Sequence, residues 1–114
     1  MALKHILFIA TGGTIASKKS RNGLKPQITP EELLEYIPQV KEVCQIEAIQ
    51  LLNLDSSNME PKHWKKIVYT IREQYEKYDG FVIAHGTDTM AYTAAALSYM
   101  IQNSKKPIVI TGAQ

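Results

Sequence analysis

Residues 6–14 read Ile6-Leu7-Phe8-Ile9-Ala10-Thr11-Gly12-Gly13-Thr14, an apolar run that breaks into two glycines flanked by threonines. A short run without polar interruption is typical of a strand that is covered on both faces, as in a parallel sheet. The glycines end the run and allow other backbone to approach closely. Lys4–Ala10 is therefore predicted to be a buried strand that ends in a polar loop.

Strand and helix patterns alternate along the rest of the chain. Lys18–Gln27 is polar and is interpreted as a mobile loop. Thr29-Pro30-Glu31-Glu32 has the composition of a capping box with proline at the first helical position, which predicts a helix from Thr29 to Ile37. Further strands are predicted at 43–52, 81–84 and 108–110, and further helices at 61–78 and 90–101, the first of these with an apolar stripe from Trp64 to Tyr78.

This order of elements imposes parallel strand pairing with right-handed crossovers. The predicted fold class is a doubly wound α/β domain, flavodoxin-like or Rossmann-like. It has helices on both faces of a parallel sheet whose strand order is 2-1-3-4. Ligands of such sheets bind beyond the carboxyl ends of the strands.

Composition narrows the class of protein. The chain has 114 residues, of which 45% are hydrophobic and 21% charged, as in a folded domain rather than a disordered chain. A net charge of +2 lacks the dense basic stripe of a nucleic-acid binder, and no run is long enough for a membrane span. A single cysteine, Cys44, excludes an internal disulfide, and the isolated histidines predict no metal site. A reduced, cytoplasmic protein with no cofactor is expected.

Small polar residues follow all four predicted strands, at Thr11–Thr14, Asp55–Asn58, His85–Thr89 and Thr111–Gly112. The first of these loops lacks the glycine patterns of nucleotide-binding motifs. The hydroxyl of Thr14 is a candidate nucleophile, although a turn threonine is the commoner interpretation of such a residue.

The other loops also have structural alternatives. Thr87 and Asp88 fit the start of a helix, with Thr87 as its N-cap. Ser56 and Ser57 suit either a carboxylate ligand or a solvated turn. For His85, a packed and hydrogen-bonded histidine at a strand end is the preferred interpretation.

Together these segments resemble the bacterial-type L-asparaginase family over the whole chain. Thr11-Gly-Gly-Thr-Ile-Ala-Ser17 and His85-Gly-Thr-Asp-Thr-Met90 resemble its two signatures, in the same order and spacing. Asp55-Ser-Ser-Asn-Met59 and Ile110-Thr-Gly-Ala-Gln114 match the loops between and after them. The serine pair resembles the cytoplasmic type I branch.

The resemblance implies hydrolysis of L-asparagine to L-aspartate and ammonia by a homo-oligomer, a dimer or a tetramer. Thr14 would be the nucleophile that forms the acyl-enzyme, and Thr87 and Asp88 would belong to a Thr-Lys-Asp group. The resemblance further assigns substrate contacts. The residues concerned are Gly13, Ser56, Ser57, Gly86, Thr87, Asp88 and Ala113. Among them, the Thr87 amide would be an oxyanion-hole donor and the Ala113 carbonyl a contact to the leaving amide.

Two features depart from the family pattern. Leu24 stands where many members carry a tyrosine on the loop beside the first threonine. Family chains are also nearly three times as long, and their catalytic lysine lies beyond the position of Gln114. Residues 1–114 are thus expected to be an incomplete N-terminal asparaginase domain that is inactive by itself, lacking the family's C-terminal domain.

Two alternatives remain open. One is the amidohydrolase subunit of a tRNA-dependent amidotransferase, which has an extra N-terminal domain and is ranked lower because the first strand starts close to Met1. The other is a non-catalytic module that binds an amino acid through the same loops.

Overall fold

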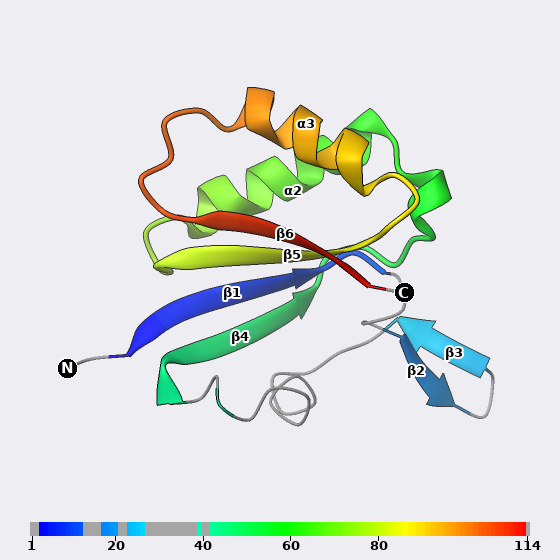
Figure 1. Ribbon diagram of the computed structural model, residues 1–114, viewed down its shortest axis with the longest axis horizontal. Helices are drawn as coiled ribbons and strands as arrows, with labels where there is room; N and C mark the ends of the chain where they lie inside the picture. The colour runs from blue at the N-terminus through cyan, green and yellow to red at the C-terminus, as the bar shows by residue number, and fades with distance from the viewer. Residues whose placement is uncertain (1–2, 13–16, 21–22, 27–38, 40–41, 114) are drawn as a thin grey trace.

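The computed structural model describes residues 3–12, 17–20, 23–26, 39 and 42–113. At its centre is a parallel sheet of four strands (Figure 1). They are β1 (Lys4–Ala10), β4 (Cys44–Gln50), β5 (Gly80–Gly86) and β6 (Ile108–Ala113), in the order β4-β1-β5-β6. This is the predicted order 2-1-3-4, and the doubly wound α/β class is confirmed.

β1 is a central strand because it buries side chains on both faces. Leu7 and Ile9 lie on one face, and Phe8 and Ala10 lie on the other, all of them buried. β1 pairs with β4 on one side and with β5 on the other, so that Ala10 is opposite both Gln50 and Ala84. The carboxyl ends of all three strands are therefore level at one edge of the sheet.

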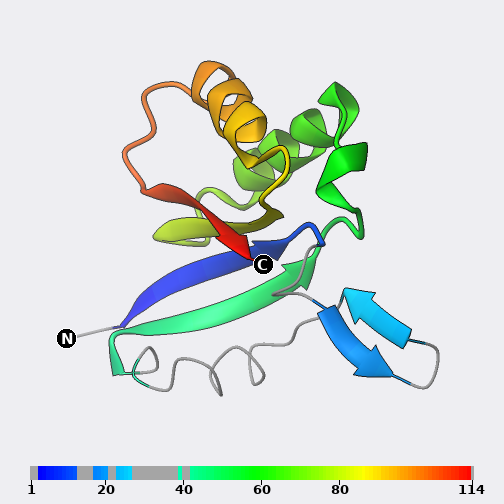
Figure 2. The ribbon, with the colours of Figure 1, turned by 45° about the vertical axis from the view of Figure 1, so that its right-hand side comes forward.

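The helices α2 (Pro61–Gln74) and α3 (Met90–Met100) lie side by side over the same face of the sheet (Figure 2). Ile67, Val68 and Ile71 of α2 and Leu97 of α3 form one core with the strand residues beneath them. The predicted apolar stripe of α2 is thus core. The helix predicted for Thr29–Ile37 lies outside the described residues.

The interpretation of the segment after Lys18 as a loop is wrong. This segment contains an antiparallel hairpin of β2 (Ser17–Ser20) and β3 (Gly23–Pro26). These strands lack the alternation of apolar and polar residues that reveals a half-buried strand in a sequence. The two strands are paired through backbone hydrogen bonds, and a side-chain pattern carries no information about those bonds.

The ring of Tyr78 joins the core to the edge strand β4. It is buried, lies edge-on to Phe81 at 6.1 Å between ring centroids, and donates its hydroxyl hydrogen bond to Glu47 Oε2 on β4. Desolvation first, and then the bond to the Glu47 carboxylate, raise the pKa of Tyr78 from about 10 to about 12.

This raised pKa predicts a loss of stability in alkali. The folded state holds the phenolic proton more tightly than the unfolded state, so the contribution of Tyr78 is complete below pH 10 and declines as the pH rises through about 12. We expect ultraviolet titration to show one late-ionising tyrosine that is absent in Tyr78→Phe. In Glu47→Gln, which keeps an acceptor but removes the charge, the same tyrosine should ionise earlier. An unchanged late titration in Tyr78→Phe would contradict the assignment.

Candidate functional site

The polar loops predicted to carry function meet at the carboxyl edge of the sheet. Thr11 and Gly12 follow β1, residues 51–58 follow β4, residues 87–89 follow β5, and β6 reaches the same edge at Ala113 (Figures 1 and 2). The arrows of the four strands point the same way because every pairing in the sheet is parallel. Described parts of all four polar segments therefore lie at one edge, as predicted. Thr111 and Gly112, however, are not a loop: they belong to β6, which runs three residues beyond its predicted end because it pairs with β5 as far as Gly86.

Thr11 ties the loop after β1 to its neighbour β5. Its side chain is buried, and its Oγ1 donates a hydrogen bond of 2.7 Å to the carbonyl of Ala84. The carbonyl of Thr11 accepts a hydrogen bond of 2.9 Å from the amide of Leu54, in the loop after β4. Thr11 thus connects the end of β1 with the end of β5 and with the loop after β4. The sequence motif alone does not reveal this structural role of Thr11.

A glycine is required at position 12 because the backbone of Leu54 lies very close to it. Its φ of +118° is a conformation that other residues rarely adopt. A Cβ at this position would lie 2.1 Å from the carbonyl oxygen of Leu54. The glycine therefore serves the contact between two loop backbones, which fits the predicted need for close approach. Gly13 and Thr14, the candidate nucleophile, lie outside the described residues.

The loop after β4 is a compact polar turn. Asp55 accepts a hydrogen bond of 3.1 Å at Oδ1 from the amide of Ser57, and residues Ser56–Asn58 form a turn of 3₁₀ helix. Ser57 is exposed, as expected for a solvated turn. The same exposure leaves its hydroxyl accessible to a ligand, so the two interpretations of this residue are compatible. The side chain of Ser56 lies outside what the structure describes.

Thr87 and Asp88 are exposed at the end of β5, and the interpretation of Thr87 as a helix N-cap is wrong. The N-cap of α3 is Thr89, and the helix begins at Met90. The reason is that β5 runs on to Gly86, where it still pairs with Ala113 of β6, two residues beyond its predicted end. The strand extension moves the helix start and leaves Thr87 and Asp88 in the connecting loop.

The end of β6 lies against this loop. A Cβ on Gly112 would stand 2.9 Å from Cγ2 of Thr87 and 3.0 Å from Sδ of Met90. Gly86, Thr87 and the Gly112–Ala113 backbone are therefore neighbours, which brings together the candidate residues of two separate motifs. Any side chain at Gly112 would push on Thr87.

His85 is fully buried one residue before the end of β5, which confirms the interpretation of it as a packed histidine. Both ring nitrogens have partners. Nδ1 lies 2.6 Å from the carbonyl oxygen of Gly86, and Nε2 lies 2.9 Å from Oγ1 of Thr93 on α3. The indole Nε1 of Trp64 on α2 donates a hydrogen bond of 2.8 Å to the same Thr93 oxygen. Thr93 is the residue of this network that sequence reasoning missed, since its place in an alanine-rich helix carries no polar signal.

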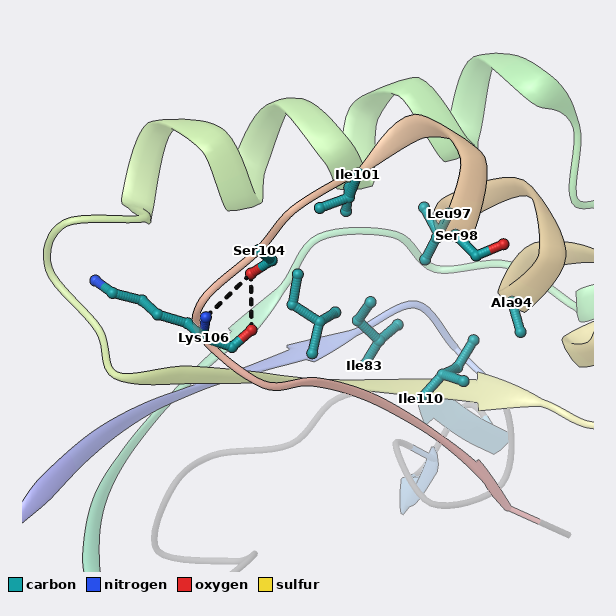
Figure 3. Close-up of a pocket in the computed structure, with 9 residues that line it drawn as sticks. Ile83, Ala94, Leu97, Ser98, Ile101, Ser104, Lys106 and Ile110 are labelled. Atoms are coloured by element: carbon teal, nitrogen blue, oxygen red, sulfur yellow. Dashed lines mark hydrogen bonds between the residues drawn. The ribbon is translucent and has the colours of Figure 1, made fainter.

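A cavity of about 410 Å³ lies elsewhere, between α3 and the face of β5 and β6. Figure 3 shows Ile83, Leu97 and Ile110 pointing into it, with Ser104 and Lys106 bonded to each other at its rim. Its lining is largely apolar, and it holds none of the predicted site residues. The candidate site is the strand edge and not this cavity.

Two further observations concern the described ranges only. Within them, no three His, Cys, Asp or Glu side chains gather in a way that could hold a metal ion. None of the helices found there is long and apolar enough to cross a membrane.

A doubly wound sheet with hydroxyl, carboxylate and backbone groups at its carboxyl edge defines an α/β domain of the kind that places its ligand site at that edge. The comparison with known proteins makes the class specific. A family model described as Asparaginase, N-terminal, matches residues 5–114. The chain therefore belongs to the asparaginase family.

Individual relatives are of two kinds. The chain is 45% identical over 115 residues to a glutamyl-tRNA(Gln) amidotransferase subunit of Pyrococcus abyssi (strain GE5 / Orsay), covering 98% of this chain and 26% of that protein. The thermostable L-asparaginase from Thermococcus kodakarensis matches with a TM-score of 0.82 and 43% identity, over 95% of this chain and 33% of that one. L-asparaginase I from Vibrio cholerae O1 biovar eltor matches with a TM-score of 0.78 and 45% identity, over 99% of this chain and 35% of that one. The chain thus spans about a quarter to a third of the length of these proteins.

Proposed function

We propose that this chain is the N-terminal part of an amidohydrolase that converts L-asparagine to L-aspartate and ammonia. One observation carries the proposal. The segments 11–17 and 85–90, which resemble the two family signatures, start at neighbouring points of the sheet, where Ala10 pairs with Ala84 and Thr11 Oγ1 bonds the Ala84 carbonyl. Two motifs more than 70 residues apart in sequence are thereby directed to the same edge.

The proposed reaction proceeds through an ester on Thr14. The Thr14 hydroxyl oxygen attacks the side-chain amide carbon of asparagine and loses its proton, which passes to the departing amide nitrogen as the C–N bond breaks. Ammonia leaves, and water then hydrolyses the ester to aspartate and regenerates the hydroxyl. A threonine hydroxyl requires a base for this step. We assign that task to Thr87, Asp88 and a lysine that the family carries outside residues 1–114.

Substrate recognition is assigned to the exposed polar groups of the other loops. Ser56 and Ser57 offer donors for the α-carboxylate, and the carboxylate of Asp88 suits the α-ammonium group. The Thr87 amide would donate to the oxyanion that develops on the amide carbonyl, and the Ala113 carbonyl would accept from the leaving amide. Gly13 and Gly86 complete the lining, where backbone must come close to the substrate.

The proposal concerns a protein longer than this chain, since its relatives are three to four times as long. We propose that the longer protein is a cytoplasmic homo-oligomer, as the type I resemblance implies, and that residues 1–114 alone have no turnover. The missing lysine and the remainder of the pocket would account for this.

A second candidate is the amidohydrolase component of a tRNA-dependent amidotransferase. The observation that favours it is the 45% identity to the glutamyl-tRNA(Gln) amidotransferase relative. Such a component would release ammonia from the same kind of amide but pass it to a partner that amidates glutamyl-tRNA. The chemistry at Thr14 would be shared, and the fate of the ammonia would differ.

An assay of the longer protein by itself tests the proposal. We expect stoichiometric aspartate and ammonia from L-asparagine. Ammonia release only in the presence of glutamyl-tRNA and a second protein would favour the amidotransferase. Calorimetric binding of L-aspartate with no ammonia release under any condition would overturn the proposal in favour of a non-catalytic binding module.

A further inference from the structure

The buried network around His85 has a defined direction. The Gly86 carbonyl oxygen can only accept a hydrogen bond, so the proton of the neutral imidazole must sit on Nδ1. Nε2 is then an acceptor, and the Thr93 hydroxyl donates a hydrogen bond to it. The indole N–H of Trp64 can only donate, and it donates to the same Thr93 oxygen. Trp64, Thr93, His85 and Gly86 thus form a one-way chain of hydrogen bonds from α2 through α3 to the end of β5.

The chain of hydrogen bonds ends at the Gly86 carbonyl, which belongs to the same peptide group as the N–H of Thr87, the proposed oxyanion donor. The peptide between Gly86 and Thr87 is planar and trans, so its C=O and its N–H point in opposite directions. His85 faces the helix layer, where Thr93 and Trp64 lie, and it holds the Gly86 carbonyl with a bond of 2.6 Å. The N–H of Thr87 must therefore point away from the imidazole and out of the buried network.

We propose that His85 is a positioning residue for the Thr87 amide, locked in one tautomer by Thr93 and Trp64. The inference rests on the proposed function, in which that amide donates to the oxyanion. Preorganised donors are effective because they need no reorientation as charge develops. Because buried polar groups are generally paired, the paired nitrogens alone do not mark a function. The inference rests on where the network ends, at the peptide whose N–H is the proposed donor.

Two substitutions of similar size separate positioning from packing. The carboxamide of His85→Asn lies near the place of Nδ1 and can still donate to the Gly86 carbonyl. The carboxamide of His85→Gln lies near the place of Nε2, where it reaches Thr93 but leaves Gly86 unbonded. In the longer protein, we expect His85→Gln to lower kcat by about 10- to 100-fold with KM changed by less than about threefold. His85→Asn should keep most of kcat although it also loses a hydrogen bond.

A second pair tests the lock on the tautomer. Thr93→Val removes the hydroxyl and keeps the branched shape, whereas Thr93→Ser keeps the hydroxyl. Thr93→Val should lower kcat and Thr93→Ser should restore most of it, with melting temperatures that do not follow this order. Equal losses of kcat in both members of each pair, in proportion to their losses of stability, would overturn the proposal.

A spectroscopic readout separates this inference from the proposed function. In protein labelled with ¹⁵N-histidine, the His85 shifts should report a proton on Nδ1 in the wild type and a disturbed ring in Thr93→Val. A proton on Nε2 alone would overturn the network even if the enzyme hydrolyses asparagine. The expected tautomer in a wild-type protein that releases no ammonia would instead refute the proposed function and leave the network in place.

Discussion

Replacing Thr14 by alanine in the longer protein is expected to lower kcat for L-asparagine by about 10⁴-fold or more, as loss of a covalent nucleophile does in other hydrolases. The fold and the affinity for L-aspartate should remain, because the proposed contacts of the product lie on Ser56, Ser57 and Asp88. Rapid quenching of the wild-type enzyme followed by peptide mass spectrometry should find an aspartyl ester on Thr14.

The matched control is Thr70→Ala. Thr70 also loses a hydroxyl in this change, but its Oγ1 bonds the carbonyl of Lys66 within α2, away from the strand ends. If Thr70→Ala keeps full activity and Thr14→Ala loses it, the loss of activity results from the position of Thr14 and not from the removal of a hydroxyl in general. Normal turnover in Thr14→Ala, or an ester mapped to another residue, would refute the assignment of the nucleophile.

Replacing Gly12 by alanine is expected to cause the largest loss of stability among simple substitutions at the site. The new methyl group would lie 2.1 Å from the Leu54 carbonyl oxygen and 2.7 Å from the Leu54 nitrogen. Both are backbone atoms that no rotamer change can move, and the φ of +118° adds strain for any residue with a Cβ. We expect the free energy of unfolding, measured in urea, to fall by at least about 3 kcal/mol.

Gly80→Ala is the control for adding a methyl group to a buried glycine. Its Cβ would first meet Ile6 Cδ1 at 3.2 Å, the end of a side chain that can shift, and then the Pro107 ring at 3.3 Å and the Pro107 carbonyl oxygen at 3.4 Å, which are much looser contacts than those at Gly12. A loss of about 1 kcal/mol is expected there. Comparable losses in the two variants would show that the contact between the loops after β1 and β4 is not the constraint we describe.

Much of the fold could be predicted from local patterns. The short uninterrupted apolar runs of β1 and β5 are typical of buried strands, and the apolar stripe of α2 has the helical period. The order of these elements then leaves few topologies for a parallel sheet. Because parallel strands end at the same edge, the sequence alone assigns the polar residues after each run to one site. The roles assigned to these residues in binding and catalysis, that of Thr14 among them, remain predictions.

Other features escaped the sequence because they depend on partners that are distant along the chain. The hairpin of β2 and β3 has no side-chain period, and β5 extends to Gly86 only because β6 pairs with it there. The N-cap of α3 is therefore Thr89 and not the predicted Thr87, because the helix can begin only after β5 has ended.

The sequence by itself determined the α/β class, the strand order and the edge at which the polar motifs gather, because hydrophobic periodicity and chain connectivity are local properties. Only the tertiary structure decided which groups touch. Thr93 bonds His85 and Trp64 across 8 and 29 residues of sequence, and Gly12 meets Leu54 across the sheet edge. Hydrogen bonds and steric contacts act over a few ångströms, so their partners become known only when packing has brought distant segments together.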